Sequence, residues 1–276
     1  MLTIAQKRAR FAELHKGPGC FIIPNPWDVG SAKYLASLGF KALATTSAGA
    51  AFAAGLPDGG MTRSAVLHHI GELAGAVDLP FNADYEAGFA STLDELHESV
   101  VRCIVTGVAG FSIEDFTGDA RGPFFGRAEA AARIRTAREA IDASGEKVLL
   151  TARSETVLRA HPDGLKEALA RLAAYAEAGA DALYAPGLRS ADEVAQVVRV
   201  AGSLPVNVLA GAPGFTLRQL EDLGVRRVSV GGSLARAAWG GFMRAAQDIA
   251  QYGRFDSFAQ AAPFAEINKL FGSDPA

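Results

Sequence analysis

Cysteine is scarce in this sequence, with only Cys20 and Cys103 among 276 residues. Neither has a second cysteine or a histidine at the spacing that a structural zinc site needs. Two cysteines are also too few to hold together a small disulfide-rich secreted domain. The cysteine content therefore excludes zinc modules and disulfide scaffolds, and it predicts a reduced protein in the cytoplasm.

Long apolar runs and an excess of one charge are absent as well. No run approaches the ~18 apolar residues of a membrane span, and charged residues interrupt residues 1–19, where a signal peptide would need a continuous apolar segment. The 27 Lys and Arg side chains nearly balance the 30 Asp and Glu, which leaves a net charge of -3. Such a balance gives no strong attraction to phosphodiester backbones or anionic lipids. We therefore expect neither a nucleic acid nor a membrane among the partners.

Several catalytic and nucleotide-binding motifs are missing too. No G-x-G-x-x-G follows the first expected strand, and the sequence has no P-loop and no G-x-S-x-G nucleophile motif. The five histidines show no metal-ligand spacing. Of the seven lysines, the two on expected strands, Lys41 and Lys147, stand at strand starts, opposite the catalytic end of a barrel. This placement disfavours a Schiff-base mechanism.

What the sequence does contain is a regular alternation of short apolar runs and amphipathic stretches. Stretches such as 93–106, 128–143 and 165–178 repeat apolar residues at helical spacing. The apolar runs predict eight strands, at 20–24, 41–46, 80–84, 110–114, 147–153, 181–185, 205–209 and 227–231. Eight strand–helix units in about 250 residues match the size of a closed (β/α)8 TIM barrel, which is the fold we predict.

The ends of the chain fit this scheme. Residues 1–19 are expected to form an N-terminal helix, and residues from about 253 to 276 carry an apolar face that would be wasted on solvent. We therefore predict a single barrel domain over residues 1–276, with the C-terminal segment packed on the barrel or on a neighbouring subunit.

Acidic residues follow the third and fourth expected strands. Asp84 and Glu86 leave the third strand two residues apart, and Glu114 ends the fourth. Because neighbouring strands lie about 4.8 Å apart, Asp84 and Glu114 are expected side by side at the mouth of the barrel. Adjacent carboxylates repel unless a cation lies between them, and oxygen ligands without His or Cys suit Mg²⁺ or Mn²⁺. The alternative is that these acids cap helices or pair with loop arginines.

Basic and polar residues end other strands. Arg153 ends the fifth strand, where its guanidinium could bind a carboxylate or phosphate or neutralise an enolate oxygen. The alternative is a salt bridge from Arg153 to Glu114 or Glu155. Residues 45–50 offer hydroxyls and unhindered amides that suit an anionic group. Tyr184 ends the sixth strand and Asn207 lies within the seventh. The segment 231–233 joins the eighth strand to its helix, where it could hold a phosphate, and tight packing is the alternative reason for its glycines.

These residues occur in segments that resemble the isocitrate lyase and phosphoenolpyruvate mutase superfamily, in particular its short bacterial members. The matching segments are TTSAG at 45–49, GLPDG at 55–59, ADYEAGF at 83–89, IED at 113–115, TAR at 151–153 and VSVGG at 228–232. The resemblance runs over most of the chain. It implies a barrel that uses Mg²⁺ and whose last helix is exchanged between the subunits of a homodimer or homotetramer.

The resemblance also implies roles for individual residues. Asp84 resembles the direct metal ligand, and Arg153 resembles the clamp on the carboxylate or oxyanion of the substrate. The predicted metal site is Asp84, Glu86, Glu114 and Asp58, the last three acting as second-shell or water-mediated ligands. The predicted catalytic residues are Arg153, Glu114 and Asp58. The predicted substrate-binding residues are Thr46, Ser47, Gly49, Asp84, Arg153 and Asn207.

Two departures from the family pattern matter. Glu86 stands where many members have Asp in a D-x-D-x-G pattern, and the extra methylene is expected to change only a water-mediated contact. Isocitrate and methylisocitrate lyases carry a K-K-C-G-H loop after the fourth strand, with the Cys as acid or base. Here residues 116–126 read FTGDARGPFFG, without Lys, Cys or His, and they do not resemble the Lys- and Asn-bearing lid of the mutase either. Standard isocitrate cleavage would need another proton donor.

The predicted function is therefore an Mg²⁺-dependent carbon–carbon lyase or decarboxylase. Its substrate would be a small 2-oxo or 2-hydroxy di- or tricarboxylate, cleaved through a metal-stabilised enolate. One alternative is P–C bond chemistry on phosphonopyruvate, which uses the same metal site. Another is a non-catalytic protein that binds a 2-oxo acid, and a third is a purely structural barrel whose acids form salt bridges at the rim.

Overall fold

The structure is a computed structural model that describes residues 1–119, 121–211 and 214–272. The described residues form eight parallel strands in one sheet, each at a position predicted from the sequence, in the order β1-β8-β7-β6-β5-β4-β3-β2. The strands are β1 (Phe21–Ile23), β2 (Leu43–Ala44), β3 (Phe81–Asp84), β4 (Gly110–Glu114), β5 (Leu149–Arg153), β6 (Ala182–Tyr184), β7 (Val206–Leu209) and β8 (Arg227–Ser229).

The two outer strands of this order, β1 and β2, come together just beyond the end of β1. The backbone N–H of Ala44 donates to the carbonyl of Pro24 at 3.0 Å. One residue further along each segment, the Asn25 side-chain amide donates to the carbonyl of Thr45 at 2.8 Å. These bonds bring the sheet almost to closure, and the predicted (β/α)8 TIM barrel is confirmed.

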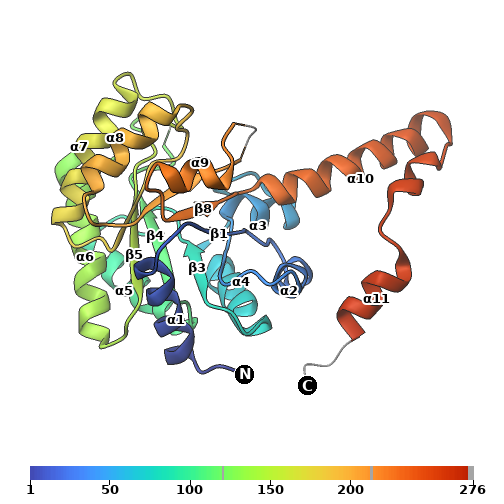
Figure 1. Cartoon of the computed structure of the whole chain (residues 1–276), viewed down its shortest axis with the longest axis horizontal. Coiled ribbons are helices and arrows are strands. Elements are labelled where there is room, and N and C mark those ends of the chain that lie inside the picture. The colour runs from blue at the N-terminus through green and yellow to red at the C-terminus, as the bar shows by residue number, and fades with distance from the viewer. Residues whose placement is uncertain (120, 212–213, 273–276) are drawn as a thin grey trace.

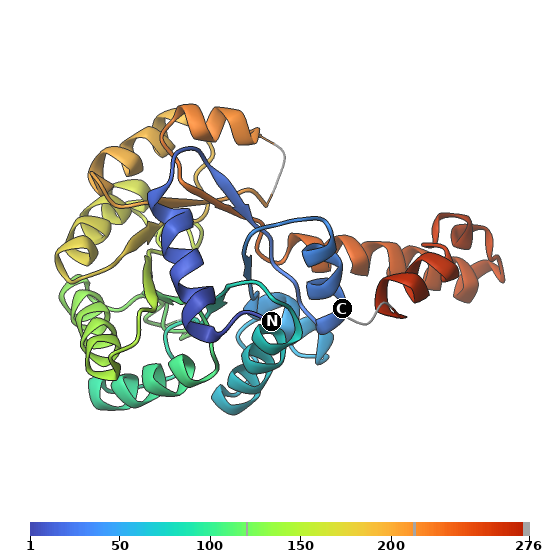
Figure 2. The ribbon, with the colours of Figure 1, turned by 60° about the horizontal axis from the view of Figure 1, so that its bottom comes forward.

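Helices surround the strands, as Figure 2 shows. They begin with α1 (Ile4–Lys16), α2 (Val29–Ser37), α3 (Ser47–Ala53), α4 (Arg63–Ala76) and α5 (Leu93–Val105). They continue with α6 (Arg127–Ser144), α7 (Gly164–Glu177), α8 (Ala191–Ala201) and α9 (Leu217–Asp222). The helices predicted at 93–106, 128–143 and 165–178 are confirmed to within one residue at each end.

Helix α5 illustrates why these segments are helical. Thr92 accepts a hydrogen bond from the Glu95 N–H while the Glu95 side chain accepts from the Thr92 N–H, which forms a capping box at the first turn. The apolar side chains of Leu96 and Val100 recur at helical spacing and are fully buried against the sheet. The helix ends before Gly107, whose φ of 88° a residue with a side chain rarely adopts.

Helix α1 closes the amino-terminal end of the barrel, across which it lies in Figure 2. The Phe11 ring on this helix is fully buried and lies so close to β4 that a Cβ on Gly110 would be 2.7 Å from it. The predicted N-terminal helix therefore forms, and it covers the amino-terminal end of the barrel.

The interior of the barrel is polar, whereas branched aliphatic side chains fill the interior of most TIM barrels. The buried polar side chains on the strands include Asn82, Ser112, Thr151, Asn207, Arg227 and Ser229. Arg227 donates to Asn207 Oδ1 at 2.9 Å and to Thr151 Oγ1 at 3.0 Å, which ties three strands together beneath the mouth. The apolar core lies instead between the sheet and the helices.

The C-terminal part of the chain extends away from the barrel as an arm, shown in orange and red in Figure 1. The arm consists of α10 (Ser233–Tyr252), the short 3-10 helix η1 (Asp256–Gln260) and α11 (Phe264–Gly272). Helix α11 contacts α2 of the same chain, where a Cβ on Gly30 would lie 3.4 Å from the Phe271 ring. The exchange of the last helix between subunits stays a prediction, and residues 273–276 of the predicted C-terminal segment lie outside the described residues. No helix within the described ranges is both long and apolar enough to cross a bilayer.

Candidate active site

Five of the predicted site residues line a cavity of about 570 Å³ at the carboxyl ends of strands β3 to β5. Active sites of TIM-barrel enzymes lie at this end because the loops that follow the strands meet there. The side chains that line the cavity include Ser47, Asp58, Glu86, Glu114, Arg153 and Arg159.

Asp84, the last residue of β3, is held by the loop that follows β2. Its Oδ2 accepts hydrogen bonds from the backbone N–H of Ser47 at 3.0 Å and from Ser47 Oγ at 2.9 Å. Its own N–H donates to Thr45 Oγ1 at 2.8 Å. Three hydrogen bonds thus fix both the backbone and the carboxylate of Asp84, which leaves one oxygen for a partner at the barrel mouth.

That partner is Arg153 at the end of β5. Its Nη1 lies 3.1 Å from Asp84 Oδ1, and its Nε lies 2.5 Å from Glu155 Oε1 and 3.3 Å from Glu114 Oε2. Burial opposes the charge of this guanidinium, but the carboxylates of Glu155, Glu114 and Asp84 outweigh it and raise the pKa of Arg153 further. The salt bridges to Glu114 and Glu155 that the sequence left as an alternative are therefore present, alongside the contact with Asp84.

The acids at the mouth outnumber the cations that face them. Burial, followed by the negative charges of Asp84 and Asp58, raises the pKa of Glu86 to about 7. Burial also raises the pKa of Glu114 well above its ordinary value, against the lowering effect of Arg153. A pair of carboxyl groups with raised pKa values indicates a cluster in which positive charge is too small to stabilise every ionised form.

This donor set fits a hard divalent cation that binds through few direct ligands. Mg²⁺ commonly takes one or two carboxylates and keeps water in its other positions. Within the described ranges, no three Asp, Glu, His or Cys side chains converge as a ready chelating group. The acids at the mouth that could hold Mg²⁺ are Asp84, Glu86, Glu114 and Asp58. The direct role of Asp84 and the water-mediated roles of the other three, which the family resemblance implies, stay a prediction.

Asp58 lies on a loop between α3 and α4, at the outer side of the cavity. Its Oδ2 is 3.6 Å from Nη2 of Arg159, a residue of the loop that follows β5. The side chain of Asp58 is 43% exposed, in contrast to the buried Glu114. The structure thus brings Asp58 to the cavity that Glu86 and Glu114 line, but on its solvent side.

Thr46 and Gly49 do not line the cavity, although Ser47 between them does. Thr46 is buried and caps α3, since its Oγ1 accepts from the Gly49 N–H at 3.2 Å. Gly49 packs so tightly against Thr46 that a Cβ on Gly49 would lie 2.6 Å from Thr46 Cγ2. In this structure the two residues shape the loop that presents Ser47, and a role for them in binding substrate stays a prediction.

Asn207 lies deeper in the barrel. It accepts from Arg227 and donates to Ser229 Oγ at 3.0 Å. It lines a small internal cavity of about 40 Å³, which Asp84, Arg153 and Tyr184 also line. Asn207 therefore belongs to the floor under Asp84 and Arg153, and the Arg153 guanidinium lies over the Tyr184 ring at 5.2 Å from its centre.

The sequence analysis did not identify Arg159, and it named Glu155 only as a possible salt-bridge partner of Arg153. Glu155 is fully buried, and its backbone N–H donates to Asp115 Oδ1 at 2.8 Å. Asp115 is itself held by Arg171 Nη1 at 3.0 Å and by the Tyr175 hydroxyl at 2.7 Å. The spacing of Glu155 and Arg159, four residues apart just after a strand that ends in Arg, is a signal that could have revealed this cluster.

The loop that follows β4 covers one side of the cavity. Phe116 and Phe124 pair as an antiparallel bridge, and Thr117 N–H donates to the Pro123 carbonyl at 2.9 Å. Near its tip, Arg121 and Asp119 bind each other at 2.8 Å. The loop therefore folds back on itself, and Ala120 within it lies outside the described residues.

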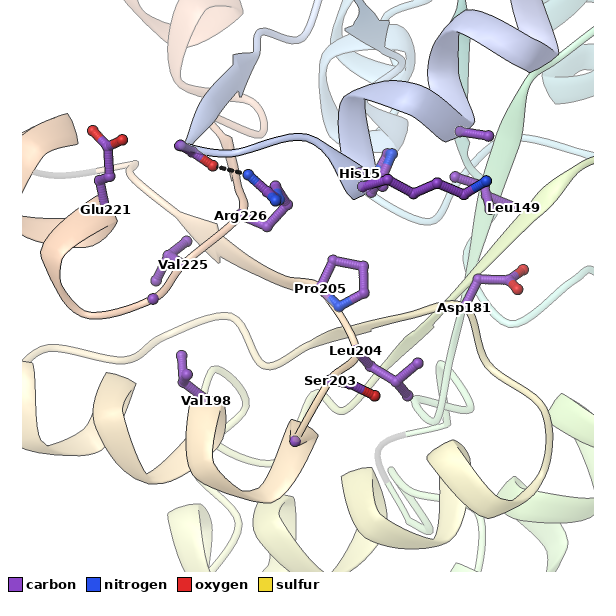
Figure 3. Close-up of a pocket in the computed structure, with 15 residues that line it drawn as sticks. His15, Leu149, Asp181, Val198, Ser203, Leu204, Pro205, Glu221, Val225 and Arg226 are labelled. Carbon is purple, nitrogen blue, oxygen red and sulfur yellow. Dashed lines mark hydrogen bonds between the residues drawn. The ribbon is translucent and has the colours of Figure 1, made fainter.

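A second hollow, of about 640 Å³, lies at the opposite, amino-terminal end of the barrel (Figure 3). Two of its charged groups are already engaged, since Arg226 donates to the carbonyl of Gly19 and Asp181 accepts from Arg138 at 3.0 Å. Burial and the charge of Arg227 lower the pKa of His15 to about 3, so this histidine is neutral. We therefore place the candidate active site at the carboxyl-terminal cavity.

Comparisons with known proteins agree with this geometry. The family model described as phosphoenolpyruvate phosphomutase matches residues 11–250. The fold is similar to a solved structure of a candidate lyase or mutase from Burkholderia cenocepacia J2315, with 47% identity, a TM-score of 0.94 and 98% of each chain covered.

Curated relatives with named activities include a plant enzyme and a bacterial enzyme. The chain is 31% identical to a chloroplastic carboxyvinyl-carboxyphosphonate phosphorylmutase of Arabidopsis thaliana, over 80% of this chain and 68% of that protein. It is 29% identical to a 2-methylisocitrate lyase of Bacillus subtilis, over 83% of this chain and 77% of that protein. The chain therefore belongs to the phosphoenolpyruvate phosphomutase family, within the isocitrate lyase and phosphoenolpyruvate mutase superfamily.

Proposed function

We propose that this protein is an Mg²⁺-dependent carbon–carbon lyase or decarboxylase that acts on a small 2-oxo or 2-hydroxy di- or tricarboxylate. The observation that carries the proposal is the contact between Asp84 and Arg153 at the barrel mouth, beside two carboxyl groups with raised pKa values. This arrangement offers one place for a cation and one fixed guanidinium for an anionic substrate. The family relationship supports an enzyme of this general type.

The residues of the chain have separate parts in this proposal. Arg153 binds a carboxylate of the substrate and stabilises the oxygen on which negative charge develops as the carbon–carbon bond breaks. Glu155 fixes the direction of that guanidinium through its contact with Nε. Ser47 holds the Asp84 carboxylate in place for the cation. When bound, the divalent cation would supply a Lewis acid beside the 2-oxo or 2-hydroxy group.

The composition of the loop after β4 favours decarboxylation over cleavage of an isocitrate. This loop, residues 116–126, contains no Cys, Lys or His that could exchange a proton with the substrate. Because CO₂ departs without taking up a proton, decarboxylation does not need an acid–base residue in this loop for that step. The 2-methylisocitrate lyase of Bacillus subtilis is a carbon–carbon lyase among the relatives, which supports the reaction class.

Chemistry on a P–C bond is the second candidate, and the relationship to the plant phosphorylmutase favours it. It would use the same acids and the same Arg153, with a phosphonate on the substrate. A protein that binds a 2-oxo acid without turning it over is the third candidate, because the loop after β4 lacks an acid–base residue of the lyase type.

The exposed arm supports a homodimer or homotetramer as the working form. Helix α10 presents Trp239 and Phe242, which are 40% and 63% exposed, and α11 presents Phe264, which is 81% exposed. Contiguous apolar side chains on an extended arm are typical of a surface that another subunit covers. The free thiols of Cys20 and Cys103 fit a reducing compartment, and the cytoplasm is part of the proposal.

The proposal is tested by a substrate screen with purified protein and Mg²⁺. The panel contains oxaloacetate, isocitrate, methylisocitrate, dimethylmalate and phosphonopyruvate, and NMR follows the products. Asp84→Ala and Arg153→Ala serve as inactive variants, and Asp94→Ala, an exposed acid on the outer helix α5, serves as the matched control.

Turnover of a carbon substrate that both site variants lose and the control retains is the expected result. Turnover of phosphonopyruvate alone would replace the proposal with P–C chemistry. No turnover on the whole panel, together with Mg²⁺-dependent binding of oxalate, would favour the binding protein.

A further inference from the structure

One buried carboxylate, Glu155, lies between two guanidinium groups. Its Oε1 is 2.5 Å from Nε of Arg153, and its Oε2 is 3.3 Å from Nε of Arg159. The side chain of Glu155 is 0% exposed, that of Arg153 is 14% exposed and that of Arg159 is 39% exposed. Both arginines line the 570 Å³ cavity, so one guanidinium stands at its inner end and the other nearer to solvent.

The fold holds Arg159 in this position from several sides. Its guanidinium carbon lies 4.3 Å from the centre of the Phe116 ring, over which the cation stacks. Its backbone N–H donates to the carbonyl of Glu155 at 2.8 Å, and the next residue, Ala160, has a φ of 54°. A non-glycine residue in the left-handed region is costly, and such conformations cluster at functional sites. The loop is thus built to present Arg159 to the cavity.

The charge of Arg159 is only partly balanced. Among the described carboxylates, Glu155 alone lies within hydrogen-bond distance of it, and Glu155 already pairs with Arg153. Asp58 is 3.6 Å away, which is too far for a hydrogen bond. A guanidinium has five N–H groups in a fixed fork, so Arg159 keeps donors for a further anion in the cavity.

We propose that Arg159 binds the distal carboxylate of the substrate and thereby selects dicarboxylic over monocarboxylic acids. This inference rests on the proposed function, in which the reacting end of the substrate lies at Asp84 and Arg153. A carboxylate at the other end of a small diacid would then meet the second guanidinium. A planar fork matches a carboxylate with two parallel hydrogen bonds, which a lysine does not reproduce.

The test compares two acids of equal length that differ only at the far end. L-malate ends in a carboxylate, whereas 2-hydroxybutyrate ends in a methyl group. Oxalate, which has no distal group, reports on the inner end alone. Isothermal titration calorimetry with Mg²⁺ measures the dissociation constants of all three for the wild type, Arg159→Met, Arg159→Lys and the matched control Arg102→Met. Arg102 is an exposed residue on the outer helix α5.

The wild type is expected to bind malate more tightly than 2-hydroxybutyrate. Arg159→Met should weaken malate binding by about 10- to 100-fold, the range expected for a lost hydrogen-bonded charge pair, and leave oxalate and 2-hydroxybutyrate within about twofold. The malate dissociation constant of Arg159→Lys should lie between those of the wild type and Arg159→Met. Arg102→Met should match the wild type. Thermal melting of each variant checks that the fold is retained.

Two results would overturn the inference while the proposed function stands. One is an equal loss for malate and 2-hydroxybutyrate in Arg159→Met, and the other is no loss for either. A larger loss for phosphonopyruvate than for malate, measured in the same way, would assign Arg159 to a phosphonate instead. Failure of the wild type to bind oxalate with Mg²⁺ would reject the proposed function and this inference with it.

Discussion

Asp84 and Arg153 lie 69 positions apart in the sequence and meet at the barrel mouth, with Nη1 3.1 Å from Oδ1. Each residue ends its strand, and the strand between them, β4, contributes Glu114 to the same guanidinium. The closed order of the strands thus turns three separate strand ends into one cluster. The predictions below test what each part of this cluster, and of the barrel beneath it, contributes.

Replacing Asp84 by Asn removes the one carboxylate expected to touch the cation directly. We expect Asp84→Asn to lose Mg²⁺-dependent oxalate binding and to lower turnover by about 100-fold or more, in keeping with the loss of a group that organises a metal site. Asp94→Asn on α5 is the control and should behave as the wild type. Calorimetry and a steady-state assay measure both effects, and unchanged oxalate binding by Asp84→Asn would remove Asp84 from the metal site.

Replacing Arg153 separates charge from geometry. Arg153→Lys keeps a cation at the buried acids but loses the fork, so we expect kcat to fall by about 10²- to 10³-fold with little change in stability. Arg153→Met also leaves Glu155 buried without one partner and should lower the free energy of unfolding by about 3 kcal/mol or more. Urea unfolding and initial rates distinguish the two variants. Wild-type kcat in Arg153→Lys would show that Arg153 has only a structural part.

His15 should make the stability of the protein depend on pH. Its Nδ1 lies 2.8 Å from the Phe11 carbonyl and its Nε2 lies 3.2 Å from Nη1 of Arg227, so the neutral form, protonated on Nδ1, satisfies both neighbours. The pKa is about 3 in the folded state, because of burial and Arg227, against an ordinary value of 6.5. Between pH 6.5 and 3 the unfolded chain therefore binds the extra proton.

It follows that the contribution of His15 to stability is complete above pH 6.5 and declines as the pH falls toward 3, with a slope of up to about 1.4 kcal/mol per pH unit. His15→Gln, which can still accept from Arg227, should show a shallower decline over this range. Chemical unfolding at pH 4, 5, 6 and 7 measures the difference between the two slopes. Parallel curves would mean that other groups cause the pH dependence.

Gly88 is required both by its backbone and by its surroundings. Its φ is 83°, and a Cβ there would lie 2.3 Å from Leu96 Cδ1. Gly39 has the same φ of 83°, with no atom within 4 Å of its Cβ position. Gly39→Ala should therefore cost about 1 kcal/mol for the backbone alone, and Gly88→Ala about 3 kcal/mol or more. Equal losses in urea unfolding would show that the contact with Leu96 relaxes freely.

The arm should control assembly. Phe242 on α10 is 63% exposed and packs edge to face against Trp239, with ring centres 5.4 Å apart. Phe242→Asp places a charge on this surface and should shift the protein toward the monomer in sedimentation velocity. Val105→Asp, at an apolar position on α5 that is 78% exposed, should leave the assembly unchanged. A wild-type protein that sediments as a monomer would contradict the proposed assembly.

Local patterns were sufficient to predict the fold. The eight strands were found because short apolar runs alternate with helical stretches, and β4 was predicted with its observed bounds, residues 110–114. The ends of β2 were predicted wrongly, since only Leu43 and Ala44 of the predicted residues 41–46 pair as a strand. Where the chain leaves a sheet depends on the neighbouring strands, so the sequence of one strand does not determine it.

The candidate site divides in the same way. Asp84, Glu114 and Arg153 were identified because each ends an apolar strand, and the order of strands in a parallel barrel brings such ends together. Thr46 and Gly49 were assigned to the substrate loop with Ser47, yet they face inward and only Ser47 lines the cavity. The sequence does not distinguish small residues that bind an anion from small residues that allow two segments to pack closely.

The sequence by itself therefore determined the periodicity of the barrel and which acids and arginine stand at its strand ends, because both are properties of neighbouring residues. The tertiary structure decided the pairing of Glu155 with two arginines and the joining of Arg227 to Asn207, Thr151 and His15. The contacts of Arg227 cross between strands and α1, and in both clusters burial removes the water that would otherwise separate charges. The pairing of the strands, the loop after β5 and the packing of α1 set these distances, and with them the chemistry that we propose.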